Sequence, residues 1–269
     1  MSLLHDLNWA VQLAEEAGDV IRESRDNGFE QQRKADKSLV TSADLASDAF
    51  LRNGIQLRAP QDAMLTEEAG WFPGASGNRT WVIDPLDGTR AFTMGHEGVS
   101  VLLGLLVGEN PVFGVAHFPF EGITYWGALG EGAFKKNRNA KRGDPLTPPE
   151  ASKRDTLALS PSTGPEQRER ILQKTSLHPG PLLHGAGAMF MCLADGRASA
   201  YFSGHGLSLW DTAGPSVILR ELGCSVTSDR GKPLQYPVTQ AEWKHDGGIV
   251  ATVGLEHQQV VKAIRLALE

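Results

Sequence analysis

Residues 81–89 read Trp-Val-Ile-Asp-Pro-Leu-Asp-Gly-Thr, and this stretch joins an apolar run to two carboxylates. Its first three residues favour a buried β-strand, which would bring Asp84 to the carboxyl end of that strand. Pro85 fixes its own φ and restricts Asp84 to extended geometry, so the chain turns at once and Asp87 can return beside Asp84. The Leu86 carbonyl would lie between the two acids. Three hard oxygen donors in one place are the ligands that Mg²⁺ prefers.

Gly88 and Thr89 follow the two acids and suit an anion. Gly88 allows the backbone to approach a ligand closely. If these two residues open a helix or a turn, their N–H groups face a phosphate. The alternative interpretation is an Asp-Pro-x-Asp-Gly surface turn, which is a common loop composition. The local pattern alone leaves both interpretations open.

The flanking sequence predicts regular elements. Apolar residues recur at helical spacing over residues 4–21, and Thr41 or Ser42 can cap a second helix. That cap places Asp44 in the first helical turn, where the helix dipole favours a carboxylate, so helix formation alone explains the residue. Short turns separate three β-like runs and predict an antiparallel meander over residues 99–107, 111–117 and 123–128.

A polar segment with three prolines at residues 141–153 is the best place for a boundary between lobes. We expect an N-terminal α+β lobe, 1–150, with the antiparallel sheet and most of the metal ligands. A C-terminal α/β lobe, 151–269, would complete one catalytic unit. The patterns in this second lobe predict strands at 157–159 and 248–253 and helices at 165–175, 186–193, 211–222 and 256–268.

The Asp-Pro-Leu-Asp-Gly-Thr run at 84–89 resembles the first signature of the inositol monophosphatase family, the lithium-sensitive, magnesium-dependent phosphatases. Leu-Trp-Asp-Thr-Ala-Gly at 209–214 resembles the second signature. Residues 34–44, 65–68 and 185–201 fall at family spacing, so the likeness spans nearly the whole chain. The resemblance implies an α/β (α+β) fold, the layered α-β-α-β-α sandwich shared with the fructose bisphosphatases.

The resemblance also implies ligands for two or three Mg²⁺ ions. Glu67, Asp84 and the Leu86 carbonyl would hold the first ion, and Asp84, Asp87 and Asp211 the second. Such an incomplete shell of oxygen ligands leaves room for water and substrate.

The implied reaction is hydrolysis of a phosphate monoester by direct attack of water. Asp44, Glu67 and Thr89 would be catalytic, with Thr89, polarised by Asp44, orienting the attacking water and helping to deprotonate it. A third, weaker metal would lie near Glu67 and Asp44. The groups that would bind phosphate or substrate are Asp87, Gly88, Thr89 and Asp211.

Three other classes of protein fit less well. An aspartyl-phosphate phosphatase of the haloacid dehalogenase type needs two aspartates two positions apart, whereas Asp84 and Asp87 are three apart. A calcium-binding module would have a longer loop of alternating acids. A degenerate phosphate- or metal-binding protein would normally have lost at least one of the acids or Thr89, and all of them are present.

The substrate is less well defined than the reaction. Inositol-preferring members of the family place an acidic residue shortly before the second signature, but residues 201–208 contain no acid. Without that carboxylate, paired ring hydroxyls lack an acceptor. Residues 34–44 and 88–92 resemble histidinol-phosphate phosphatases and 3′-phosphoadenosine phosphatases of the same superfamily equally well.

The composition narrows the possible partners. The chain has 269 residues, 41% hydrophobic content and a formal net charge of −6, which argues against a nucleic-acid binder. No leader pattern or membrane-spanning window is present, and Cys192 and Cys224 are expected to be buried free thiols. We therefore expect a cytoplasmic homodimer that acts on a small phosphorylated metabolite and binds neither nucleic-acid polymers nor membranes.

Overall fold

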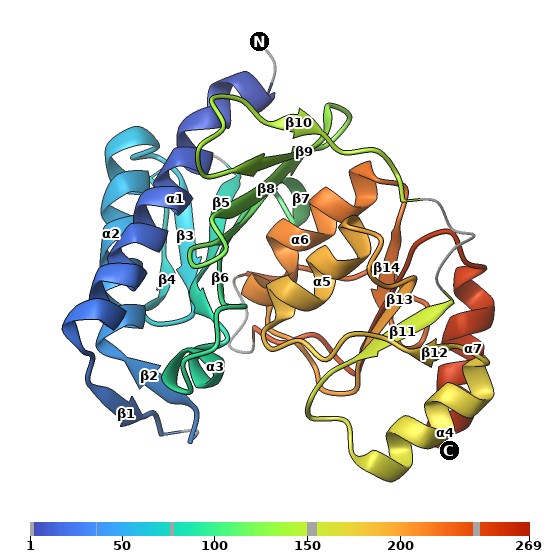
Figure 1. The fold of residues 1–269 in the computed structure, drawn as a ribbon. Coiled ribbons are helices and arrows are strands. Elements are labelled where there is room, and N and C mark those ends of the chain that lie inside the picture. The colour runs from blue at the N-terminus through green and yellow to red at the C-terminus, as the bar shows by residue number, and fades with distance from the viewer. Residues whose placement is uncertain (1–2, 36, 76–77, 150–154, 239–242) are drawn as a thin grey trace.

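The computed structural model describes residues 3–35, 37–75, 78–149, 155–238 and 243–269. Two sheets alternate with three layers of helix (Figure 1). The helices are α1 (Leu3–Asn27), α2 (Ser42–Arg58), α3 (Thr89–Thr93), α4 (Pro165–Thr175), α5 (Ala186–Ala194), α6 (Leu209–Glu221) and α7 (His257–Leu268). A separate hairpin pairs β1 (Gln31–Arg33) with β2 (Leu39–Thr41).

The larger sheet has the strand order β10-β9-β8-β7-β6-β5-β3-β4. Its neighbours are antiparallel except for β3 and β5, which run parallel. The predicted meander is confirmed as β6, β7 and β8, and β9 extends it. The strands are β3 (Ala63–Thr66), β4 (Gly70–Phe72), β5 (Arg79–Asp87), β6 (Ser100–Val107), β7 (Asn110–Phe118), β8 (Ile123–Ala128), β9 (Gly132–Asn137) and β10 (Asp144–Pro145).

The smaller sheet has the strand order β12-β11-β13-β15-β14. Strands β12, β11 and β13 are parallel, while β15 pairs antiparallel with both β13 and β14. Its strands are β11 (Thr156–Leu159), β12 (His178–Pro179), β13 (Ala200–Ser203), β14 (Ser225–Ser228) and β15 (Ile249–Thr252).

The layer order is the predicted α-β-α-β-α sandwich. Helices α1 and α2 cover one face of the larger sheet, and α5 and α6 cover its other face. The same α5 and α6 contact the smaller sheet, whose far side carries α4 and α7 (Figure 1). The central position of α6 brings its amino terminus to the edge of the larger sheet where β5 ends.

Glycine permits the close packing of α6 on the larger sheet. A β-carbon at Gly114 of β7 would lie 2.1 Å from the carbonyl oxygen of Gly214 in α6, which no side chain could tolerate. The helix backbone therefore rests directly on the strands. This packing fixes the height of α6, and with it Asp211, above the sheet.

Some elements differ in extent from the prediction. Helix α1 continues to Asn27, because Arg25 packs over the rings of Phe92 and Phe120 and so stabilises its polar last turn. Strand β5 does not end at Asp84 but continues to Asp87, with an irregular register between the two acids. That irregularity is the turn expected from Pro85, accommodated inside a strand.

The boundary between lobes remains a prediction, because residues 150–154 lie outside the described residues. The thiols of Cys192 and Cys224 are both free and buried, as predicted. Within the described ranges, no helix has the length and apolar character needed to cross a membrane.

His117 on β7 makes acid destabilisation an expected property of the fold. Burial lowers the pKa of His117 to about 4. Its Nδ1 shares a 2.9 Å hydrogen bond with Thr124 Oγ1, while its Nε2 has no partner among the described residues. The unfolded chain binds a proton near pH 6.5 and the folded chain does not, so stability is lost as the pH falls from 6.5 towards 4. The expected loss is on the order of 2–3 kcal/mol by pH 4.5.

Urea unfolding at several pH values measures this loss. His117→Gln should make the free energy of unfolding less dependent on pH across that window, whereas His178→Gln, at an exposed position, should not. Parallel pH dependences for His117→Gln and the wild-type protein would contradict the assignment.

Candidate active site

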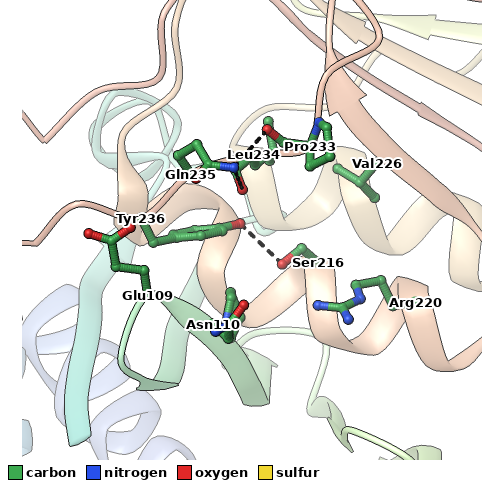
Figure 2. A pocket seen from close by; sticks show the side chains of 10 residues that line it. Glu109, Asn110, Ser216, Arg220, Val226, Pro233, Leu234, Gln235 and Tyr236 are labelled. Atoms are coloured by element: carbon green, nitrogen blue, oxygen red, sulfur yellow. Dashed lines mark hydrogen bonds between the residues drawn. The ribbon is translucent and has the colours of Figure 1, made fainter. Parts of the chain in front are cut away.

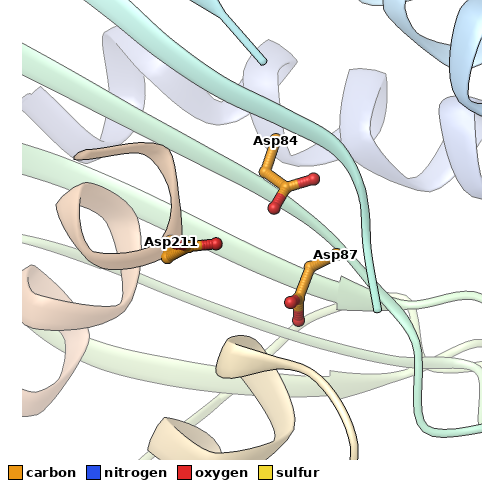
Figure 3. Close-up of side chains that lie close together, drawn as sticks. All are labelled: Asp84, Asp87 and Asp211. Carbon is orange, nitrogen blue, oxygen red and sulfur yellow. The ribbon is translucent and has the colours of Figure 1, made fainter. Parts of the chain in front are cut away.

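Three carboxylates converge where β5 ends and α6 begins. One oxygen atom from each of Asp84, Asp87 and Asp211 lies within 4.8 Å of the others (Figure 3). Asp84 and Asp87 are buried, and Asp211 is partly exposed. The structure thus joins the two segments that resemble the family signatures in one acidic cluster.

The chain around Pro85 holds Asp84 in place. Asp84 Oδ1 accepts a hydrogen bond from the Leu86 amide at 3.1 Å, which closes the short turn between the acids. Ser47 of α2 donates its hydroxyl to the Pro85 carbonyl at 2.8 Å. Helix α2 therefore fixes the position of this turn from behind.

Asp87 is held by a second part of the chain. Its Oδ1 accepts from the Ala186 amide and its Oδ2 from the Gly187 amide, both at 2.8 Å. The Ser100 hydroxyl also donates to Oδ2 at 2.8 Å. The start of α5 thus orients a carboxylate that belongs to β5.

Asp211 lies in the first turn of α6 and belongs to a capping box. Its Oδ2 accepts from the Ser208 amide at 2.6 Å. The carboxylate faces Asp84 and Asp87 (Figure 3). The carboxyl groups of Asp211 and Asp84 are close enough to hydrogen bond. Two acids at this separation require either a proton or a cation between them.

The electrostatics of the cluster favour a bound cation. Burial raises the pKa values of Asp84 and Asp211 well above the ordinary value of an aspartate, and neighbouring carboxylates raise both further. Burial likewise raises the pKa of Asp87, although its three hydrogen bonds oppose the change. Buried like charges are costly unless a cation compensates them. The donor set consists of hard oxygen atoms and can bind a metal ion.

Asp44 and Thr89 form a pair beside the cluster. Thr89 Oγ1 donates to Asp44 Oδ1 at 2.7 Å and lies 3.2 Å from the Leu86 carbonyl oxygen. Asp44 Oδ2 accepts from the Thr41 amide and hydroxyl. The predicted cap of α2 is therefore present with Thr41 as the N-cap, and Asp44 joins it in a capping box that was not predicted. Burial raises the pKa of Asp44, and these hydrogen bonds oppose the change.

Glu67 lies outside the compact group of three carboxylates. Its side chain pairs with Lys34 Nζ at 3.3 Å, and Glu68 pairs with the same nitrogen at 2.7 Å. Burial raises the pKa of Glu67, and the charges of Asp44 and Asp87 add to this effect. Glu67 is therefore within electrostatic range of the acidic cluster. Burial also raises the pKa of its neighbour Glu68, to about 7.

Gly88 immediately precedes the short helix α3 and has a left-handed backbone, at φ 87°. A β-carbon at Gly88 would lie 3.6 Å from Gly185 Cα, so the chain before α5 packs against this loop. The first N–H groups of a helix have no acceptor within the helix. The Gly88–Thr89 loop therefore offers donors beside the acidic cluster.

Sequence reasoning missed the residues that orient the acids. Thr41 was predicted only as a helix cap, and its hydrogen bonds to Asp44 were not predicted. The donors to Asp87, which are Ser100, Ala186 and Gly187, were not predicted either. The only signal was the small-residue run Gly-Ala-Gly at 185–187, which is typical of a close backbone approach.

A separate cavity of about 280 Å³ lies between α6 and the β6–β7 turn, and its lining includes none of Asp84, Asp87 and Asp211. Figure 2 shows Tyr236 in its wall, with its hydroxyl 3.2 Å from that of Ser216. Arg220 and Glu109 face the same space (Figure 2). The group of carboxylates that could hold a metal ion lies in the acidic cluster and not in this cavity.

Comparison with known proteins identifies the family of this chain. The model of the inositol monophosphatase family matches residues 3–268. The chain belongs to the inositol monophosphatase family. It is 30% identical over 234 residues to the 3′(2′),5′-bisphosphate nucleotidase CysQ of Shigella flexneri, covering 86% of this chain and 93% of CysQ. It is 31% identical over 240 residues to inositol monophosphatase 1 of Bos taurus, covering 85% of each chain.

The solved structures confirm the fold. The IMPase of Thermotoga maritima superposes with a TM-score of 0.80 at 21% identity, covering 97% of each chain. Together these similarities confirm three predictions: membership of the inositol monophosphatase family, the layered fold, and the class of phosphoric monoester hydrolase.

Proposed function

We propose that this chain is a magnesium-dependent phosphomonoesterase that hydrolyses a small phosphorylated metabolite by direct attack of water. The observation that supports this most is the convergence of Asp84, Asp87 and Asp211 beside the Thr89–Asp44 hydrogen bond. A cation site and a group able to orient water thus lie next to one another. Phosphoryl transfer depends mainly on such positioning and charge stabilisation.

The acidic residues divide into overlapping ligand sets. Glu67, Asp84 and the Leu86 carbonyl would hold one Mg²⁺ ion, and Asp84, Asp87 and Asp211 a second. A third ion near Glu67 and Asp44 would be weaker. Bound Mg²⁺ would offset the phosphoryl charge and make water a better nucleophile near neutral pH.

The chain's own residues would orient the reactants. The Gly88 and Thr89 amides would hold the phosphoryl oxygens, while the Thr89 hydroxyl accepts a hydrogen bond from the attacking water and donates to Asp44. A proton leaving the water can then pass to Thr89 Oγ1 as the Thr89 proton passes to Asp44. Burial raises the pKa of Asp44, which suits a proton acceptor.

A degenerate binding protein is the alternative from another class. The presence of every acid together with Thr89 favours an enzyme, because a protein that only bound phosphate would not need the Thr89–Asp44 pair. Binding of Mg²⁺ and phosphate without turnover would support the degenerate alternative.

The first candidate for the substrate is an inositol phosphate, and the second is a 3′(2′),5′-bisphosphate nucleotide. Residues 201–208 contain no carboxylate that could accept hydrogen bonds from inositol hydroxyls, and CysQ of Shigella flexneri is a nucleotidase of this class. Histidinol phosphate remains a further candidate from the sequence resemblance.

A phosphate-release screen with and without Mg²⁺ tests the proposal. The substrates are inositol phosphates, histidinol phosphate, fructose 1,6-bisphosphate and adenosine 3′,5′-bisphosphate. Magnesium-dependent release from at least one is expected, with EDTA abolishing it. No release from any of them at saturating Mg²⁺ would count against the reaction class.

Lithium is expected to inhibit turnover in an uncompetitive or noncompetitive manner towards substrate. The cluster of Asp84, Asp87 and Asp211 is partly exposed at Asp211, so its ion can exchange during turnover. Li⁺ that took this position after bond cleavage would block the return of Mg²⁺ and so delay the next turnover. Steady-state kinetics in LiCl, with KCl as the ionic-strength control, measure this effect. Equal rates in both salts across the millimolar range would reject an exchangeable, lithium-sensitive site.

The remaining expectations are a homodimer and a cytoplasmic location. The two free, buried thiols suit a reducing compartment, and the dimer rests on the family resemblance. Light scattering during gel filtration would give the mass, for which two chains of 29.0 kDa are expected.

A further inference from the structure

Residues 243–245 form backbone hydrogen bonds with residues 207–209, just before Asp211. We call residues 243–245 the brace. The Leu209 amide donates to the Trp243 carbonyl at 2.8 Å, and the His245 amide donates to the Leu207 carbonyl at 2.9 Å. Ser208 and Lys244 form the β-bridge between these two hydrogen bonds. The brace thus pairs with residues 207–209, at the start of α6.

The side chain of His245 reaches the helix itself. Its Nε2 shares a 2.7 Å hydrogen bond with Thr212 Oγ1, and Thr212 directly follows Asp211. Both residues are buried. Burial lowers the pKa of His245 to about 4, so the ring is neutral at pH 7 and acts as a hydrogen-bonding partner rather than a charge. Tyr236 packs edge-on against this ring at 5.3 Å between centroids.

The other end of the brace contacts the chain that carries Glu67. The Trp243 ring lies over Gly70, where a β-carbon would be 3.5 Å from Trp243 Cη2. Trp243 also packs against Trp210, at 6.3 Å between ring centroids. One segment therefore touches Gly70, the first residue of β4, and both neighbours of Asp211 in sequence.

We propose that His245 is a positioning residue for Asp211, which it orients through Thr212 and the first turn of α6. This inference rests on the proposed function. Asp211 Oδ2 is held by the Ser208 amide, and Ser208 is itself paired with the brace. The direction of the Asp211 carboxylate therefore depends on how firmly residues 207–212 are held. Substitution of a residue that orients a metal ligand commonly lowers metal affinity about 10–100-fold.

Two substitutions separate the hydrogen bond from the volume of the ring. His245→Phe keeps a planar ring but loses the partner for Thr212, whereas His245→Gln keeps an amide near the position of Nε2. His257→Phe is the control, because the His257 ring makes hydrogen bonds of 2.7 Å to Thr227 and 2.8 Å to Thr252, neither of which adjoins an acid of the cluster. Thr212→Val removes the same hydrogen bond by replacing the Thr212 hydroxyl, and it replaces His245→Phe in the test if that variant does not fold.

The readouts are the Mg²⁺ concentration for half-maximal phosphate release and the rise in melting temperature caused by Mg²⁺ without substrate. His245→Phe and Thr212→Val should each need about tenfold more Mg²⁺ in both measurements. His245→Gln should recover most of this loss, and KM for substrate at saturating Mg²⁺ should stay near the wild-type value.

Two results would overturn the inference. One is an unchanged Mg²⁺ requirement in both His245→Phe and Thr212→Val. The other is an equal change in His257→Phe, which would show a general loss of stability. These results leave the proposed function intact if the wild-type protein still releases phosphate with Mg²⁺. A wild-type protein with no Mg²⁺ response in either measurement would overturn both.

Discussion

Asp84→Asn is expected to lower kcat by on the order of 10³-fold while leaving the fold intact. Asp84 belongs to both proposed ligand sets, so the amide weakens both, and charge stabilisation by a metal contributes several kcal/mol to the transition state. The side chain is buried and of nearly equal volume, so the packing around Pro85 should not change. Asp211→Asn should act in the same direction through one ligand set.

Without metal, the same substitution should maintain or raise the melting temperature. Burial raises the pKa of Asp84 well above 3.8, and the charges of Glu67 and Asp87 raise it further. The folded protein therefore binds this proton more tightly than the unfolded chain. Stability is then lost as the pH rises from about 3.8 through the raised pKa, and Asn does not ionise and avoids that loss.

Turnover at saturating Mg²⁺ and a thermal melt in EDTA at pH 7 measure the two effects. Asp144→Asn is the control, because Asp144 is exposed on the edge strand β10. Activity near the wild-type level in both Asp84→Asn and Asp211→Asn would remove the proposed metal site. A fall in the EDTA melting temperature of Asp84→Asn alone would contradict the electrostatic argument.

The sequence predicts those parts of the site that depend on neighbouring residues. Pro85 turns the chain within three residues, so the approach of Asp87 to Asp84 could be inferred locally. The cap of α2 by Thr41 and the place of Asp44 in its first turn could likewise be predicted from the local sequence. The link between Asp44 and Thr89 came only from the family resemblance.

The parts that could not be predicted join distant segments. Asp87 accepts from amides 99 and 100 residues further along the chain, and backbone amides carry no sequence signal of their own. The height of α6 depends on the contact between Gly114 and Gly214, which only the folded sheet creates. The salt bridges of Lys34 to Glu67 and Glu68 could not be predicted either, because a lysine in a loop is equally consistent with an exposed position.

Thr89→Ala is expected to lower kcat by about 10²–10³-fold with little change in KM, in the range of a lost general acid–base group. The backbone amides of Gly88 and Thr89 remain available to bind phosphate. The hydroxyl that lies 2.7 Å from Asp44 Oδ1 is lost, and with it the orientation of the attacking water. Thr89→Ser keeps a hydroxyl on the same atom and should retain most of the activity.

Asp44→Asn tests whether the two side chains act as one unit. If the Thr89 proton passes to Asp44, the amide cannot accept it, and the double variant should be scarcely slower than Thr89→Ala alone. Asp44 also caps α2 through Thr41, so each variant needs a thermal melt to separate a loss of stability from a loss of catalysis. Multiplicative effects on kcat would mean that the residues act independently. A large rise in KM for Thr89→Ala with normal kcat would make Thr89 a binding residue and exclude the proposed proton path.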